Sequence, residues 1–162
     1  MVVLSTLPWG SGRQRQAKRA LRKCSFDFNR LGVDIPVYEK DSDFMPGATA
    51  QFHAGKEVWL HKDMGPWTFG QTLIEELGHA VDKYCLNDEQ RALIIAAYGG
   101  ESWWKVEIDP ATGRNKFYAY QIGETFAHQG FMLAYAPELY RSHGWPYPTT
   151  PKIAKRIKEI VG

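Results

Sequence analysis

The sequence predicts a single α+β domain. A small mixed or antiparallel sheet with an edge hairpin is expected to pack on a helix that carries candidate site residues, ahead of a predominantly helical C-terminal half. Two patterns predict this class: residue types alternate around Gly55, as in a hairpin, and apolar residues later recur at helical spacing. The 162 residues, 44% of them hydrophobic, suffice for one ordinary core, so we expect one domain over 1–162.

The N-terminal part is expected to contain one helix and the strands of the sheet. A helix at about 11–31, rich in basic residues, precedes a strand at 33–39. Two further strands, 48–54 and 56–62, form the hairpin around Gly55. We expect 56–62 to be an edge strand.

The helix that carries the sequence TLIEELGHAVDKY is expected to begin near Thr68. Thr68 and Gln71 have the spacing of a capping box, and the apolar stripe continues to about Tyr84. Asn87 then offers a cap for a further helix at 89–98, which stops at a pair of glycines.

Helices are also expected near the C-terminus. The stretch 103–115 is expected to be irregular or a hairpin, because its DPATG sequence is a turn signal. The stretch QIGETFAHQGFMLAYA, 121–136, is expected to be a helix that ends before a proline. A short amphipathic helix follows at about 149–161.

Composition limits the expected partners and compartment. The net charge is +2, so we expect the basic 11–31 helix to have a solvated face, with nucleic-acid binding as the weaker alternative. No window has the length of a membrane span, and the short apolar opening lacks the pattern of a signal peptide. Because Cys24 and Cys85 form no CxxC motif, we expect a cytoplasmic protein with reduced thiols.

Two Glu-x-x-x-His pairs are the candidate chemistry of this sequence. Residues i and i+4 of a helix share one face, so Glu75 can act with His79, and Glu124 with His128. If the two helices face each other, they surround a divalent cation with two carboxylates and two imidazoles, and Glu76 lies beside the first pair, free to act as a base. The alternative is that each pair is an ordinary exposed helix contact.

The segment EELGHAVD, with the preceding strand KEVWLHK and the later ETFAHQGF, resembles the zincin metallopeptidases. Within them it is similar to the anthrax lethal factor catalytic domain and its small stand-alone relatives from bacteriophages and bacteria, over a motif core of about 48–140. The resemblance implies that His79 and Glu124 are zinc ligands and that Glu76 is the general base that activates water. It also implies that Gly78 allows close packing behind the site.

The chain departs from that family at two positions. Glu75 stands where the family has its first histidine ligand, and His128 stands where lethal factor has a glutamate. One imidazole is lost and one regained, so we expect the ligands of one divalent ion, zinc first and manganese or iron as alternatives, to be Glu75, His79, Glu124 and His128. The substitution Glu75→His would restore H-E-L-G-H and is expected to raise zinc affinity. The other interpretation is that Glu75 marks an inactive site.

The remaining candidates are aromatic residues and histidines. The resemblance implies a tyrosine that assists the oxyanion, for which Tyr118 and Tyr120 are the candidates. Trp103 and Trp104 are expected either to line a peptide groove or to pack in the core. Ordinary surface or strand positions are expected for the other histidines, which are His53, His61 and His143.

Two function classes follow from these residues. In the first, the chain is a metal-dependent peptidase: the strand 56–62 aligns an extended peptide or protein substrate, the cation polarises its carbonyl, and Glu76 moves the proton. In the second, the chain is an inactive zincin-shaped protein that binds a target protein, such as a phage-encoded effector of a host protein. Neither class involves a membrane.

Overall fold

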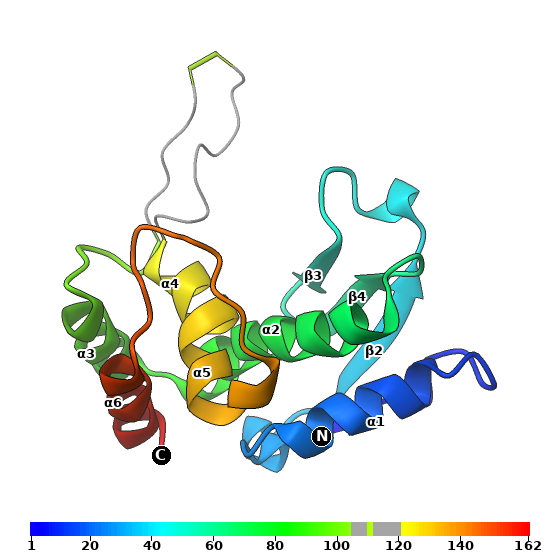
Figure 1. Cartoon of the computed structure of the whole chain (residues 1–162), viewed down its shortest axis with the longest axis horizontal. Coiled ribbons are helices and arrows are strands. Elements are labelled where there is room, and N and C mark those ends of the chain that lie inside the picture. Colours follow the sequence, from blue (N-terminus) through cyan, green and yellow to red (C-terminus); the bar gives the residue numbers. More distant parts are fainter. Residues whose placement is uncertain (105–109, 112–120) are drawn as a thin grey trace.

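The computed structural model describes residues 1–104, 110–111 and 121–162. The α+β class agrees with the prediction, since a four-stranded sheet from the N-terminal half is combined with a helical C-terminal half (Figure 1). Helix α2 (Pro66–Cys85) runs through the middle of the molecule, between the sheet and the C-terminal helices. It is the element on which the candidate site is built.

The sheet has the strand order β1-β2-β4-β3. Strands β1 (Val2–Val3), β2 (Ile35–Lys40) and β4 (Glu57–His61) run parallel to one another, whereas β3 (Ala50–His53) is antiparallel to β4. The prediction that 56–62 is an edge strand is wrong, because β4 pairs with β2 on one side and with β3 on the other. The outer strand of the hairpin is β3.

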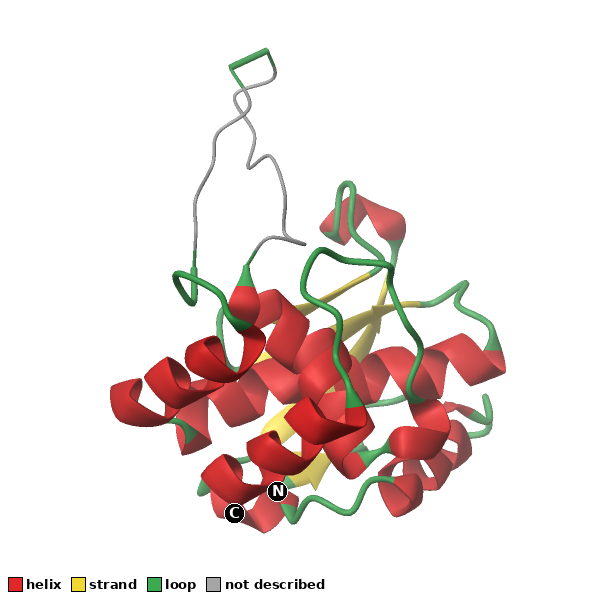
Figure 2. Cartoon of the chain, turned by 60° about the vertical axis from the view of Figure 1, so that its left-hand side comes forward, coloured by secondary structure: helices red, strands yellow, loops and turns green. Residues whose placement is uncertain are grey.

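One hydrophobic core joins the sheet to the helices. Side chains alternate along β4, where Val58 and Leu60 are buried and Trp59 is partly exposed on the other face. Helix α2 is buried on most of its sides, because three parts of the molecule pack against it: helix α1 (Arg13–Lys23), the sheet and the C-terminal helices. Figure 2 shows most of the helices gathered on one side of the strands.

The predicted helix at 11–31 is two elements in the structure. Helix α1 ends at Lys23, and a separate 3₁₀-helix, η1, spans Phe28–Leu31. Between them Cys24 has an extended backbone, and the backbone N–H of Ser25 donates to the Tyr135 carbonyl at 2.7 Å. The Asp27 side chain then accepts from a backbone N–H of η1 and starts the new element.

Helix α2 begins at Pro66, before the predicted start at Thr68. Proline suits this first position because its fixed φ is already helical and its missing N–H needs no partner. The predicted capping box of Thr68 and Gln71 is wrong. The Gln71 side chain instead donates to the Leu139 carbonyl at 2.6 Å, which ties α2 to the C-terminal half.

Helices α3 (Asp88–Tyr98) and α6 (Pro151–Val161) agree with the prediction and pack against each other. Asn87 and Gln90 form a capping box at the start of α3, and the Thr150 side chain caps α6. None of the described helices combines the length and apolar character that crossing a membrane requires.

The predicted helix at 121–136 contains a π-helical segment. It is divided into α4 (Ile122–Thr125), the π-helix η4 (Phe126–Gly130) and α5 (Phe131–Tyr135). At the end of η4 a backbone N–H donates to the carbonyl five residues earlier, which is the π-helical pattern. Such segments are rare and occur frequently at functional sites.

Candidate metal centre

The two Glu-x-x-x-His pairs come together because α2 and η4 approach closely. A Cβ atom built on Gly78 would lie 2.8 Å from the carbonyl oxygen of Ala127, so only glycine allows this approach. The neighbouring residues His79 and His128 consequently face each other. The predicted close packing at Gly78 is confirmed.

The side chains of His79, His128 and Glu124 converge. Nε2 of His79 lies 3.3 Å from Nε2 of His128, and Oε2 of Glu124 lies 3.6 Å from the first nitrogen and 3.4 Å from the second. Ligand atoms of a tetrahedral zinc ion, each at about 2.0–2.2 Å from the metal, are about 3.4 Å apart. These three atoms therefore have the spacing of a zinc site with three protein ligands.

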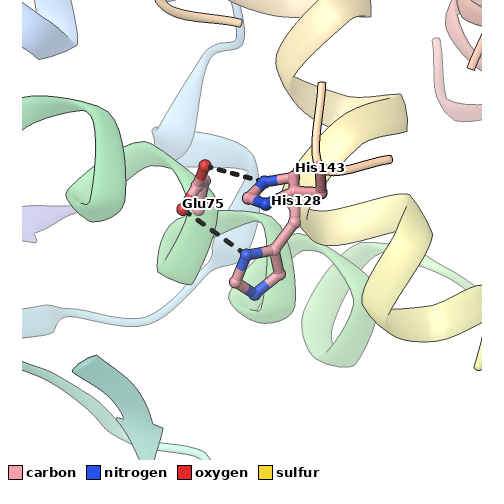
Figure 3. Close-up of side chains that lie close together, drawn as sticks. All are labelled: Glu75, His128 and His143. Atoms are coloured by element: carbon pink, nitrogen blue, oxygen red, sulfur yellow. Dashed lines mark ion pairs between the residues drawn. The ribbon is translucent and has the colours of Figure 1, made fainter. Parts of the chain in front are cut away.

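Glu75 lies next to these residues and contacts one of them, His128, together with Arg141 and His143. Its side chain is 1% exposed, and Nε and Nη2 of Arg141 each lie 3.2 Å from one of its carboxylate oxygens. Nδ1 of His128 lies 3.4 Å from Oε2 of Glu75, and Nε2 of His143 lies 3.4 Å from Oε1 (Figure 3). Two groups of candidate ligands result, and they share one histidine: His79, Glu124 and His128, and Glu75, His128 and His143.

Arg141 and His143 are residues of the cluster that sequence patterns do not reveal. The prediction of an ordinary surface position for His143 is wrong, because its side chain is 16% exposed and stacks on Trp145 with 4.6 Å between ring centroids. Both residues follow the C-terminal end of α5 in an irregular segment. Their separation from Glu75 along the chain carries no periodicity, so only the folded chain brings them to it.

The charge of Glu75 is maintained by its neighbours. Burial alone would raise the pKa of this carboxyl, but the contacts with His128 and His143 and the charge of Arg141 lower it to about 2. Glu75 is therefore a carboxylate at neutral pH, although it is almost fully buried.

The protonation of His79 and Glu124 is coupled. Burial would lower the pKa of His79, but the contact with Glu124 raises it to about 9. In turn, the pKa of Glu124 is lowered by His79, although burial opposes this shift. Burial raises the pKa of Glu76, which is 4% exposed and lies next to Glu75 in α2.

The cluster lines a cleft of about 760 Å³. Glu76 and strand β3 also line it, so the edge of the sheet lies at the same cleft as the candidate ligands. The two tryptophans of the predicted pair have different environments, and core packing is confirmed for Trp103 alone. Trp104 is 49% exposed and lines the cleft, whereas Trp103 is buried and donates its indole N–H to Asp82 at 3.0 Å.

Two of the remaining sequence candidates, His53 and His61, lie outside the cluster. His53 stacks on Trp59 with 3.5 Å between ring centroids, and His61 accepts a backbone N–H after β4. Tyr118 and Tyr120 lie outside the described residues. In comparisons with known proteins, no family model, no curated protein and no solved structure matches this chain.

Proposed function

We propose that this protein is a metal-dependent peptidase of the zincin type. The observation that carries the proposal is the spacing of 3.3–3.6 Å between the ligand atoms of His79, His128 and Glu124. Two imidazoles and one carboxylate are a donor set that suits zinc, with manganese or iron as alternatives. The fit requires no movement of the two helical segments, since their side chains already converge.

Glu76 is the proposed general base. A divalent cation beside it would supply a Lewis acid that polarises a carbonyl oxygen and makes water more acidic. Glu76 takes the proton from the attacking water and delivers it to the leaving amine. The raised pKa that burial gives this carboxyl suits both steps, because a base works best when its pKa lies near the working pH.

The proposed substrate is an extended polypeptide. Among the described strands, β3 pairs with β4 alone, so its outer edge has backbone N–H and C=O groups free to pair with a further strand. An extended chain that pairs with β3 would lie along the cleft that His79 and Glu76 line. Strand β3 thus takes the aligning role that the sequence suggested for 56–62.

Metal content tests the first part of this proposal. We expect the purified protein to contain, or to take up, about one zinc, manganese or iron ion per chain, and His79→Ala to lose it. His61→Ala is the matched control, because it removes an imidazole that lies outside the cluster, and it should keep the ion. A stoichiometric ion that survives His79→Ala would contradict the proposal, as would a protein that takes up none of these metals.

Glu76→Gln tests the catalytic part. A general base contributes about 10² to 10⁴-fold to a rate, so cleavage of a peptide library should fall by that factor while metal content and folding are retained. The alternative function is binding of a target protein without turnover, and the exposed Trp104 at the cleft favours it. In that case Glu76→Gln leaves the biological effect at full strength and Trp104→Ala removes it.

A further inference from the structure

The two nitrogens of His128 face different partners. Nε2 lies among the atoms of the candidate metal site, 3.3 Å from Nε2 of His79 and 3.4 Å from Oε2 of Glu124. Nδ1, on the other side of the ring, lies 3.4 Å from Oε2 of Glu75 (Figure 3). Histidines that bind a metal through one nitrogen almost always donate the other N–H to a carboxylate, a carbonyl or water, and this contact fixes the tautomer and the ring orientation.

Glu75 is itself held from outside α2. The Arg141 guanidinium approaches both carboxylate oxygens in the fork geometry of a bidentate pair, at 3.2 Å each. His143 approaches one of the same oxygens at 3.4 Å. These contacts fix the orientation of the Glu75 carboxylate without a metal ion.

These contacts favour an indirect role for Glu75. Both of its oxygens are already shared with a guanidinium, and a divalent cation placed there would be repelled by that positive charge. Its candidate ligand group contains His128 and His143 but neither His79 nor Glu124. Glu75 and the three converging ligand atoms are thus connected through one ring, that of His128.

We propose that Glu75 is a positioning residue, which orients His128 so that Nε2 binds the metal, and that Arg141 and His143 in turn hold Glu75. This inference rests on the metal site proposed above. It also explains the departure from the zincin pattern. Glu75 stands in α2 where zincins have their first histidine ligand, and its carboxylate supports His128, the histidine gained in η4.

Glu75→Gln tests this role through metal affinity. Loss of such a supporting carboxylate typically weakens metal binding about 10 to 100-fold, and we expect a loss of this size in a competition titration with a zinc chelator. Glu39→Gln is the matched control, because Glu39 is also a largely buried carboxylate paired with an arginine, Arg13, but lies in β2 away from the cluster. It should leave the affinity unchanged.

The visible spectrum of bound Co²⁺ separates positioning from direct ligation. If Glu75 only orients His128, the Glu75→Gln protein binds Co²⁺ more weakly, but at saturation its bands keep their wavelength and intensity, because the number of ligands is the same. A spectrum of altered coordination number would show that Glu75 is a ligand and would overturn the proposal. A wild-type protein with two ions per chain, one of them lost in Glu75→Gln, would overturn it in favour of a second metal site.

Two further variants keep the test valid if Glu75→Gln folds poorly. Arg141→Gln leaves Glu75 and His128 in place but removes the group that holds the carboxylate, so it should weaken zinc binding less than Glu75→Gln does. Glu75→His supplies an imidazole but removes the partner of His128, so zinc affinity should fall, whereas the family pattern predicts a rise. Unchanged affinity in Arg141→Gln, or a rise in Glu75→His, would refute positioning while leaving the metal site intact. A wild-type protein that binds no ion would refute both.

Discussion

At the scale of single residues, His79 would link metal binding at the proposed site to pH. Burial would lower its pKa, but Glu124 raises it to about 9, so the imidazole is protonated at pH 7 in the metal-free protein. Since a histidine ligand must be neutral, we expect binding of each cation at pH 7 to release about one proton. Apparent zinc affinity should therefore increase with pH until about pH 9. Calorimetry in buffers of different ionisation enthalpy measures the number of protons, and no release at pH 7 would contradict the assignment.

The raised pKa of His79 also affects the stability of the metal-free protein. This stability is expected to decrease as the pH rises, whereas zinc affinity increases. A raised pKa means that the His79–Glu124 pair stabilises the fold fully below the unfolded value of 6.5, and that this contribution is lost as the pH rises through about 9. Urea unfolding should show a decrease in the free energy of unfolding over this interval. Glu124→Gln removes the charge that raises the pKa, so its decrease should be smaller. An equal decrease in both proteins would show that other groups cause it.

The sequence predicts some of these residues and not others for a physical reason. Glu124 and His128 share a helix at i, i+4 spacing, so their proximity follows from local geometry. The pairing of Glu75 with Arg141 depends on how the segment after α5 folds back over α2, which no local pattern encodes. Spacing along one helix also does not distinguish a metal ligand from a residue that orients one.

At the scale of elements, the crossing of α2 and η4 determines the distances between the side chains that are proposed to bind the metal. Gly78→Ala would place a methyl group against the carbonyl of Ala127, so the two segments must move apart. We expect a loss of about 1–3 kcal/mol in the free energy of unfolding, as for other overpacked sites, together with weaker zinc binding.

Gly65→Ala is the matched control for that prediction. It makes the same change at the start of the same helix, where a Cβ atom meets nothing within 4 Å. Zinc affinity should be unchanged in this variant. Equal zinc affinity in Gly78→Ala and wild type would show that the close approach is not needed for the site.

Element boundaries and strand order differ in how far the sequence determines them. Helix α3 is predictable because its cap, Asn87, is a local signal, and α6 because its apolar residues recur at helical spacing. The order of the strands was not, because a hairpin pattern does not show which of its strands also pairs with β2. The prediction of an edge strand at 56–62 is wrong for this reason, and the edge of the hairpin is β3.

At the scale of the whole molecule, the candidate metal site joins two parts of the chain that are far apart in sequence. His79 belongs to the long helix behind the sheet, whereas Glu124 and His128 belong to the C-terminal half. A second connection lies just after α1, where the backbone N–H of Ser25 donates to the carbonyl of Tyr135, the last residue of α5. We therefore expect a bound ion to disfavour separation of these two parts of the chain at the second connection as well.

The rate at which the Cys24 thiol is alkylated measures how often the two parts separate. Cys24 is a free thiol next to Ser25, it is 8% exposed, and burial raises its pKa to about 11, so it reacts slowly with alkylating agents in the folded protein. An ion at 100 times its dissociation constant stabilises the folded state by about 2.7 kcal/mol, which reduces the open population about 100-fold. Saturating zinc should slow alkylation of Cys24 by about this factor. Cys85, which is partly exposed, should be slowed less, and His79→Ala should abolish the protection. Equal slowing of both cysteines, or protection that persists in His79→Ala, would show that zinc acts on the thiols and not through the proposed site.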